Sequence, residues 1–392
     1  MLIATILTEI LFPINIKYFV VKILKSSIEL KTLKLIAVIF LIIFLSNLME
    51  TKNLLKEMVV YLSKLNLPKK IQFIILPAFI GLLPMPGGAL FSAPMVDKAL
   101  SGENFLNEEK TFINFWFRHI WEYFFPLYPG VILVTELYSF PSYKLFEYHS
   151  IFTILMLILG YFIVLKGKNI KNNLTKNEKF FQNLLGLIYS ISPVIIIFIF
   201  VFIFKLNVVV SIAISCIFSI FLYKTSLSQL LKISKKSIKF DMLIMILGIF
   251  YFKKSLEITG AINLLPKMIS SNNIFTLTIL LIFLPLISGL LTGITIAYVG
   301  ISFPVLSSYF FLGNSLYMPN LVLAYISGFI GVLLSPVHLC LLLTNEYFDS
   351  NLMKVYKLLI KGGLPLFIFL IIYYFILKTF SISWICSSIL PS

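Results

Sequence analysis

Long apolar segments separated by short lysine-bearing stretches run along the whole chain. A helix needs roughly 20 apolar residues to cross a bilayer. On that basis the candidate spans fall near 2–23, 34–50, 70–97, 110–135, 148–166, 183–204, 206–223, 240–260, 274–312, 318–345 and 356–378. The stretch 51–66 is instead amphipathic and is expected to lie at the membrane interface. The pattern therefore predicts an all-α, polytopic membrane protein of about 10–11 transmembrane segments.

An internal repeat links the two halves of the chain. Residues 76–94 read LPAFIGLLPMPGGALFSAP, and residues 284–304 read LPLISGLLTGITIAYVGISFP. Their Leu-Pro, Gly and Leu-Leu positions coincide at a constant offset of 208 residues, and Gly and Pro positions are set by backbone geometry rather than by hydrophobicity. We therefore expect a first repeat at 1–166, a linker with one transmembrane helix at 167–207, and a second repeat at 208–392. Chance similarity between two apolar sequences is the alternative.

The two segments that carry this match, 70–97 and 274–312, are too long and too interrupted to be one plain helix each. Pro84-Met85-Pro86-Gly87-Gly88 does not continue an α-helix, because proline removes a donor and glycine releases the backbone. A helix that stops inside the membrane exposes N–H groups at one end and C=O groups at the other, and these ends bind anions and cations. The candidate substrate-binding residues at the two interruptions are Gly87, Gly88, Ser92, Thr292, Thr295 and Ser302. A kinked packing helix with small residues is the alternative.

The relative orientation of the repeats depends on whether 70–97 is re-entrant. If it is, each half crosses the membrane four times and the linker helix makes the repeats inverted. If it crosses once, the lysine-rich loops 22–34, 166–179 and 224–239 all face one side, as the positive-inside rule prefers, and the repeats are parallel.

Composition excludes most other classes of protein. Of the 392 residues, 59% are hydrophobic and only 12% are charged, whereas soluble domains are about 25% charged. A soluble enzyme, a nucleic-acid-binding protein and a disordered scaffold are therefore excluded. The net charge of +16 comes almost entirely from lysines in the loops, where it reports membrane orientation. Glu9 in the first apolar run favours a retained helix over a signal peptide.

Arg118 is the only arginine in the chain, and it lies within an apolar segment. Asn114, Arg118 and Glu122 are spaced i, i+4, i+8, which predicts one shared helix face, and His119 lies on a neighbouring face. A charge at membrane depth is usually buried toward a cavity or a partner. The planar guanidinium of Arg118 is suited to hold a carboxylate or phosphate bidentately. The alternatives are a structural Arg118–Glu122 pair that locks the helix and a snorkelling position of Arg118 near the membrane interface.

Few residues suggest other chemistry. His338, beside Ser335-Pro336, is a candidate proton relay or substrate contact, with a packing role as the alternative. The three cysteines are isolated, and no Cys/His spacing typical of a metal site occurs, so we expect neither metal nor cofactor. No HExxH, GxSxG or Walker A motif is present, which argues against an enzyme and against a self-contained ATP-driven pump.

Two motifs carry a family resemblance. GLLPMPGGALFSAPMV at 81–96 and FRHIWEYFFPLYPG at 117–130 resemble the DUF401 family of uncharacterised integral membrane proteins, and the resemblance extends over most of the chain. That family looks related to the ion transporter superfamily, which includes gluconate-type and citrate-type carriers. The resemblance implies inverted repeats, each with a re-entrant hairpin and a broken helix. The chain lacks the paired Ser-Asn-Thr motifs of the sodium–dicarboxylate carriers, so neither dicarboxylates nor sodium coupling is implied.

These observations lead to the hypothesis of a secondary active transporter in the cell (plasma) membrane. Its substrate would be a small anionic solute, an organic anion such as a carboxylate or sugar acid, bound near the bilayer midplane between the repeats. Arg118 would neutralise the anion, and a coupling cation, H⁺ or Na⁺, would drive transport, with His119, Glu122 or His338 as the proton relay. Its other partner is the lipid bilayer, and no nucleic acid is expected. A homodimer, a channel-like pore and a non-transporting assembly or accessory protein remain open.

Overall fold

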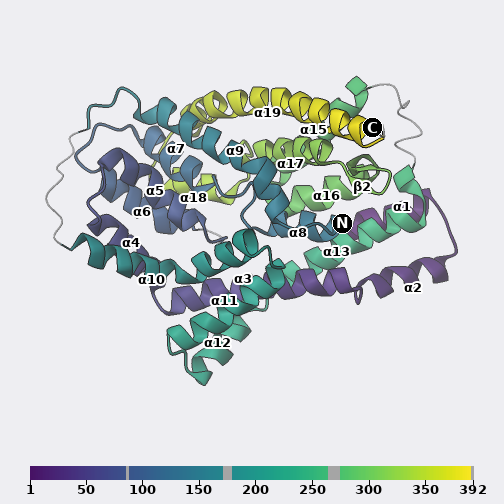
Figure 1. Ribbon diagram of the computed structural model, residues 1–392, viewed down its shortest axis with the longest axis horizontal. Coiled ribbons are helices and arrows are strands. Elements are labelled where there is room, and N and C mark those ends of the chain that lie inside the picture. Colours follow the sequence, from purple (N-terminus) through teal and green to yellow (C-terminus); the bar gives the residue numbers. More distant parts are fainter. Residues whose placement is uncertain (85–87, 171–178, 264–273, 390–392) are drawn as a thin grey trace. The chain divides into compact units, whose positions relative to one another are not determined.

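The computed structural model describes residues 1–84, 88–170, 179–263 and 274–389. These residues form helices joined by short connections, together with one small hairpin of the strands β1 and β2 (Figure 1). Five of the described helical stretches are long and apolar enough to cross a bilayer: Leu30–Thr51, Tyr143–Leu165, Phe180–Ile203, Phe275–Thr292 and Leu352–Phe380. Apolar helices of this length indicate a membrane protein.

The chain divides into two compact units, and each contains segments distant in sequence. Unit 1 comprises Met1–Leu33, Ile244–His338 and Ile360–Ser392, and unit 2 comprises Lys34–Leu243 and Leu339–Leu359. Helices α3 (Leu30–Thr51), α13 (Phe240–Ile258) and α19 (Leu352–Ile389) continue from one unit into the other along the chain.

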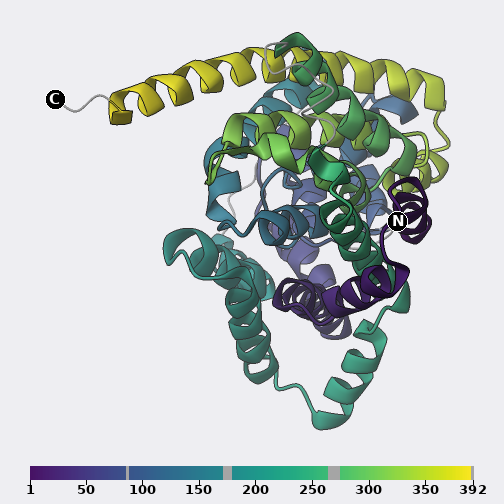
Figure 2. The same cartoon turned by 90° about the vertical axis from the view of Figure 1, so that its right-hand side faces the viewer.

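Unit 2 is built from helices packed around a mostly apolar core. Besides most of α3, its elements are α4 (Leu54–Lys64), α5 (Lys69–Gly81), α6 (Ala89–Leu100), α7 (Asn107–Arg118), α8 (Pro129–Tyr138), α9 (Tyr143–Gly160) with the π-helical turn η1 (Tyr161–Leu165), α10 (Phe180–Phe198) with η2 (Ile199–Ile203), α11 (Val208–Leu222), α12 (Leu227–Ser237) and α18 (Leu339–Tyr347). Figure 2 shows α11 and α12 as the two arms of a V. The amphipathic helix expected within 51–66 is α4, which buries Leu54, Leu55, Met58 and Leu62.

Helices α5 and α6 form a hairpin within unit 2. The two helices pack against each other. Lys69, the first residue of α5, forms an ion pair with Glu103, which follows α6, so the outer ends of the hairpin meet. The expected interruption of 70–97 is therefore confirmed. Helix α5 has 13 residues and spans about 20 Å, less than the roughly 30 Å hydrocarbon core of a bilayer.

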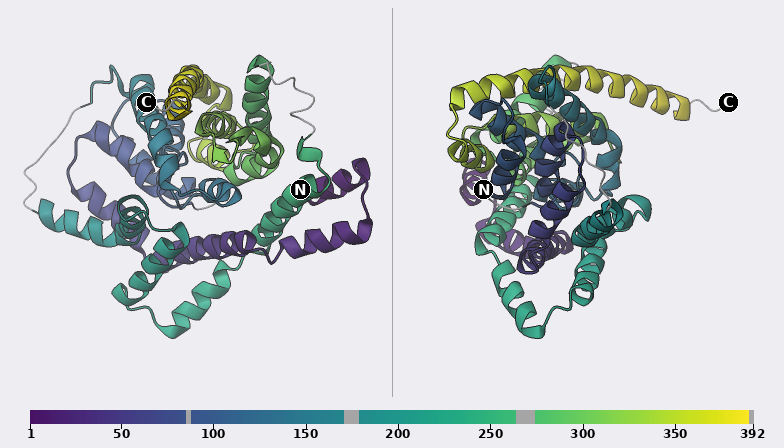
Figure 3. Two further views of the ribbon diagram at one scale, coloured as in Figure 1. Left: turned by 45° about the vertical axis from the view of Figure 1, so that its right-hand side comes forward. Right: turned by 90° about the vertical axis from the view of Figure 1, so that its left-hand side faces the viewer.

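Unit 1 contains a second helical hairpin. Its elements are α1 (Leu2–Leu11), α2 (Ile16–Ser26), most of α13, η3 (Ala261–Asn263), α15 (Ile274–Thr292), α16 (Thr295–Leu306), η4 (Ser307–Phe310), β1 (Phe311–Leu312), β2 (Ser315–Leu316), α17 (Met318–Leu333) and most of α19. Helices α15, α16 and α17 pack against one another, as the green helices in the left panel of Figure 3 show. Because η3 contacts both α16 and η4, the chain before α15 lies beside the chain after α16.

Each hairpin packs against the next helix at a glycine. In unit 2, a Cβ added to Gly81 of α5 would fall 2.0 Å from the carbonyl oxygen of Arg118 at the end of α7. In unit 1, a Cβ added to Gly289 of α15 would fall 2.1 Å from the carbonyl oxygen of Gly328 in α17. The backbones therefore touch directly at both crossings, which a larger residue does not allow.

Three expected spans are divided in the structure. The segment 2–23 contains two helices, because Pro13 separates α1 from α2 and the Asn15 side chain caps the start of α2. The segment 318–345 is divided between α17 and α18, on either side of Ser335-Pro336. The segment 110–135 is divided between α7 and α8, so the prediction that Asn114, Arg118 and Glu122 share one helix face is wrong.

Candidate functional site

The connection between α7 and α8 is an ordered interruption buried in unit 2. Helix α7 ends at Arg118, and α8 starts with Pro129, whose missing N–H suits a first helical position. Helix α9 satisfies the carbonyls that this interruption exposes. Thr153 Oγ1 donates to Ile120 O at 2.6 Å, and His149 Nδ1 lies 2.7 Å from Tyr123 O.

This interruption lies against the inner end of the α5–α6 hairpin. The Tyr128 hydroxyl donates to the carbonyl of Gly81, the last residue of α5. Trp121 Nε1 donates to Ala78 O at 2.8 Å, one turn earlier. Carbonyls at a helix end lack intrahelical partners, and here side chains from the neighbouring break supply them. Two interrupted helical segments therefore meet in unit 2.

A buried polar cluster occupies this meeting point. Arg118 is only 3% exposed, and its Nη1 donates to Cys340 Sγ of α18 at 3.1 Å. Glu122 lies in the interruption rather than on α7, and its Oε1 is 3.6 Å from His119 Nε2. His119 is fully buried, and its Nδ1 lies 2.6 Å from Phe115 O. The cluster brings a cation, a carboxylate, an imidazole and a thiol into the interior.

Asn114 lies one turn before Arg118 on α7 and is fully buried. Its Nδ2 donates to Thr344 Oγ1 at 3.0 Å and to Ala89 O, at the start of α6, at 3.3 Å. Thr344 Oγ1 donates its own proton to Cys340 O at 2.7 Å. Both oxygens that contact Nδ2 are therefore hydrogen-bond acceptors. The atom of the Asn114 amide that faces them must be the nitrogen, because only the nitrogen donates. Asn114 Oδ1 is left buried without a hydrogen-bond partner in the described part of the chain.

The other candidates of the first hairpin lie near its interruption. Gly88 caps the start of α6 and is buried, whereas Gly87 lies outside the described residues. Ser92 is fully buried, and its hydroxyl is directed to the carbonyls of Ala89 and Gly88 in its own helix. Serine in an apolar helix commonly donates its hydroxyl proton to a backbone carbonyl in this way. The lone pairs of its oxygen then stay available to accept a hydrogen bond.

The second-half candidates lie in unit 1. Thr292 and Ser302 donate to carbonyls four residues earlier in their own helices, Ser288 O at 2.7 Å and Tyr298 O at 2.6 Å. Thr295 opens α16 and is buried, and its hydroxyl has no hydrogen-bond partner among the residues that the structure describes. The three side chains therefore flank the interruption between α15 and α16, two of them already bonded to backbone.

His338 follows the end of α17 and lies beside this second interruption. Gly293 connects α15 to α16 with a φ of +64°, and a Cβ there would fall 3.0 Å from the His338 Cα. Ser335 Oγ donates to Leu290 O at 2.7 Å, and His338 Nδ1 lies 3.0 Å from Val332 O. In unit 1, as in unit 2, the interruption of a hairpin lies against the end of the following helix.

Four residues of these sites were not predicted from the sequence: Cys340, Thr344, His149 and Thr153. Cys340 and Thr344 are more than 220 residues from the Arg118 and Asn114 side chains that they contact, so sequence spacing gives no sign of the contact. His149 and Thr153 lie at i, i+4 on an apolar helix and hold the α7–α8 connection. That spacing was the one available signal.

Comparison with known proteins identifies the family. The model of DUF401, described as a protein of unknown function, matches residues 1–377. No curated protein matches the chain.

Proposed function

We propose that this chain, which belongs to the DUF401 family, is a secondary active transporter of a small organic anion in the cell membrane. The observation that carries the proposal is the buried Arg118, held where the interruptions of two helical segments meet. Interrupted helices in membranes are tolerated where they line a cavity or a binding site.

Arg118 supplies the reason for an anionic substrate. A guanidinium has five N–H donors in a planar fork and stays charged, so it favours a carboxylate that binds two donors at once. Its Nη1 donates to the Cys340 thiol, which is a weak acceptor. A carboxylate oxygen accepts more strongly because the hydrogen bond is then charge-assisted. We infer that the anion displaces this contact.

Asn114 refines the class of anion. Its Oδ1 is a buried acceptor without a partner in the described part of the chain, one helical turn from Arg118. A buried acceptor left unsatisfied costs about 1–3 kcal/mol, so a ligand that donates to it gains affinity. A carboxylate that also carries a hydroxyl group can bind Arg118 and donate to Asn114. The site therefore favours a hydroxylated organic acid, such as a sugar acid, over a plain carboxylate.

The arrangement of helices supports a carrier built from two repeats. The helices α1, α2, α3, α5, α6, α7, α8 and α9 are followed in the same order by α11, α12, α13, α15, α16, α17, α18 and α19. Gly81 and Gly289, which the sequence repeat aligns, make the same close contact with the helix after their own hairpin. Helix α5, with 13 residues, is too short to cross the bilayer, which favours the re-entrant alternative for 70–97 and with it four crossings per half and inverted repeats.

The buried cluster favours a proton as the ion whose movement is coupled to transport. Glu122 and His119 lie side by side and buried, and Glu122 also interacts electrostatically with Arg118. An imidazole next to a carboxylate can accept and release a proton near neutral pH. We therefore assign the coupling proton to this pair. His338 remains a second candidate relay at the interruption of unit 1.

Thermal unfolding of the detergent-purified protein against a panel of anions tests the proposal. A ligand that binds the native state raises its apparent stability, by about 2.7 kcal/mol at 100 times its dissociation constant. We expect a hydroxylated acid such as gluconate to stabilise the wild type but not Arg118→Ala. Lys354→Ala, which removes a surface cation paired with Glu108, is the matched control and keeps the response. No stabilisation by any anion at millimolar concentration contradicts the proposal and favours an accessory protein.

A further inference from the structure

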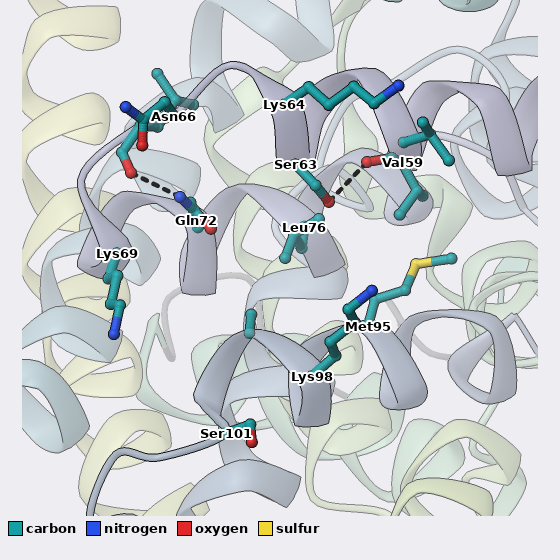
Figure 4. A pocket seen from close by; sticks show the side chains of 13 residues that line it. Val59, Ser63, Lys64, Asn66, Lys69, Gln72, Leu76, Met95, Lys98 and Ser101 are labelled. Atoms are coloured by element: carbon teal, nitrogen blue, oxygen red, sulfur yellow. Dashed lines mark hydrogen bonds between the residues drawn. The ribbon is translucent and has the colours of Figure 1, made fainter. Parts of the chain in front are cut away.

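Unit 2 contains a cavity of about 550 Å³ between α4, α5 and α6, separate from the Arg118 cluster (Figure 4). It lies at the outer end of the α5–α6 hairpin, where the start of α5 and the end of α6 meet. A volume of this size holds a ligand of a few tens of atoms.

Basic side chains from three helices surround the cavity (Figure 4). Three lysines from three helices line it, namely Lys64 at the end of α4, Lys69 at the start of α5 and Lys98 near the end of α6. None of the described residues that line it is acidic. Lys69 is neutralised by Glu103, whereas the ammonium group of Lys98 has no ion-pair or hydrogen-bond partner among the described residues. Ser63 and Ser101 add hydroxyls. The cavity is therefore suited to an anion.

Apolar side chains line the cavity between the lysines. Val59 and Val60 of α4, Leu76 of α5, and Met95 and Ala99 of α6 line it. Leu76 also belongs to the apolar core that α4 forms with α5 and α10, so this wall is a rigid part of the packed unit. A soluble phosphate or carboxylate gains no affinity from apolar side chains, whereas a hydrocarbon chain does, because its burial against them removes apolar surface from water.

The position of the cavity matches the boundary of a bilayer. Helix α4 is amphipathic, with a buried apolar face and exposed Ser63 and Lys64. Charged lysine head groups at helix ends lie at the level of the lipid head groups while their stems cover apolar surface. These features favour a hairpin base, with Lys69 and Lys98, at the membrane surface, and a deeper position for Gly81 at the other end of α5.

We propose that this cavity binds the head group of an anionic phospholipid. The phosphate is held by Lys64 and Lys98, and the glycerol and the first part of an acyl chain lie along Leu76 and Met95. Lysines near a membrane surface attract anionic lipid head groups electrostatically. A zwitterionic lipid is a poorer ligand because its own ammonium group is repelled by the lysines. The bound lipid would hold the base of the hairpin at the membrane surface.

The test uses delipidated, detergent-purified full-length protein and short-chain lipids. Thermal unfolding is followed with diheptanoyl-phosphatidylglycerol, diheptanoyl-phosphatidylcholine and inorganic phosphate as probes. We expect phosphatidylglycerol to raise the unfolding temperature with an apparent affinity at least tenfold above that of phosphatidylcholine, and inorganic phosphate to have no effect. The Lys64→Gln/Lys98→Gln variant should lose most of this preference. Lys232→Gln/Lys235→Gln on α12 removes two exposed lysines elsewhere and should retain it.

Three results would overturn the proposal: equal effects of the two lipids, an equal effect of inorganic phosphate, or an unchanged preference in Lys64→Gln/Lys98→Gln. Equal stabilisation by inorganic phosphate would point to a soluble phosphate compound instead. The single variant Lys98→Gln guards against misfolding of the double variant, because Lys98 is exposed and makes no ion pair in the described structure. It should lower the phosphatidylglycerol affinity several-fold without shifting the unfolding temperature of the lipid-free protein.

Discussion

Asn114 and Arg118 lie one turn apart on α7, and each offers a hydrogen-bonding group to the interior of unit 2. Arg118 donates to a thiol, and the Asn114 carbonyl oxygen accepts nothing from the described residues. A native protein rarely leaves such a group unsatisfied unless a ligand or water completes it. At the scale of single residues, these two groups define what the substrate has to provide.

Asn114→Ala tests this definition. The substitution removes the oxygen that we assign to the substrate hydroxyl and the amide that bonds Thr344 and Ala89 O. We expect binding of gluconate to weaken about tenfold, while hexanoate, which has no hydroxyl, binds as it does to the wild type. The removed partners also lower the free energy of unfolding by about 1–3 kcal/mol.

Thr111→Val is the control for Asn114→Ala. It breaks a buried hydrogen bond of 2.8 Å between Thr111 and Ser350, one turn earlier on α7. The stability loss should be similar, but the ratio of gluconate to hexanoate affinity should not change. An equal loss of affinity for both acids in Asn114→Ala would assign Asn114 a structural role only.

Charge in an apolar segment was enough to select Arg118, His119 and Glu122 from the sequence. Their partners were not predictable, because Cys340 and Thr344 reach the cluster only through the folding of α18 into unit 2. The expected shared face of Arg118 and Glu122 was wrong for a local reason. The run FWFRHIWEYFF contains neither glycine nor proline, so only Pro126 beyond it signals that α7 ends inside it.

At the scale of elements, glycine and proline marked the interruptions of 70–97 and 274–312 in the sequence, and both are present. The sequence did not show that the next helix is also interrupted opposite each of them. That arrangement depends on tertiary hydrogen bonds, such as Tyr128 to Gly81 O and Ser335 to Leu290 O. Periodicity alone does not encode such contacts.

Close helix contact makes the two aligned glycines sensitive to substitution. In Gly81→Ala and Gly289→Ala, the new methyl group meets a backbone carbonyl at 2.0 and 2.1 Å, so the helices must separate. We expect each variant to lose about 1–3 kcal/mol of stability. Gly363→Ala, whose methyl group would meet Leu334 at 3.7 Å, should behave as the wild type. Thermal unfolding in detergent measures all three, and a stable Gly81→Ala would contradict the packing.

The hairpin of α5 and α6 predicts the side of the membrane that its ends face. Single cysteines at Lys70 and Ser101, in a chain whose native cysteines are replaced by alanine, should react with an impermeant maleimide from the same side. A segment that crossed the bilayer once would expose them on opposite sides. Labelling of intact and opened vesicles distinguishes the two results.

At the scale of the whole molecule, the order of helices predicts how the halves are oriented. Lys17 near the start of α2 and Ser228 near the start of α12 are exposed and occupy matching positions in the two halves. Inverted repeats require an odd number of crossings between them. Cysteines at Lys17 and Ser228 should therefore be labelled from opposite sides. Labelling from one side would establish parallel repeats, as the lysine-rich loops favour.

The measurement that tests the central claim most directly is uptake of radiolabelled gluconate into proteoliposomes that contain the purified protein. A carrier with the Arg118 site predicts uptake that saturates with concentration and is accelerated by unlabelled gluconate inside. It further predicts a loss of at least tenfold in Arg118→Lys, because the ammonium group keeps the charge but not the bidentate fork. Uptake that rises linearly with concentration would indicate a channel. Uptake that is unchanged in Arg118→Lys would contradict the assignment of the site.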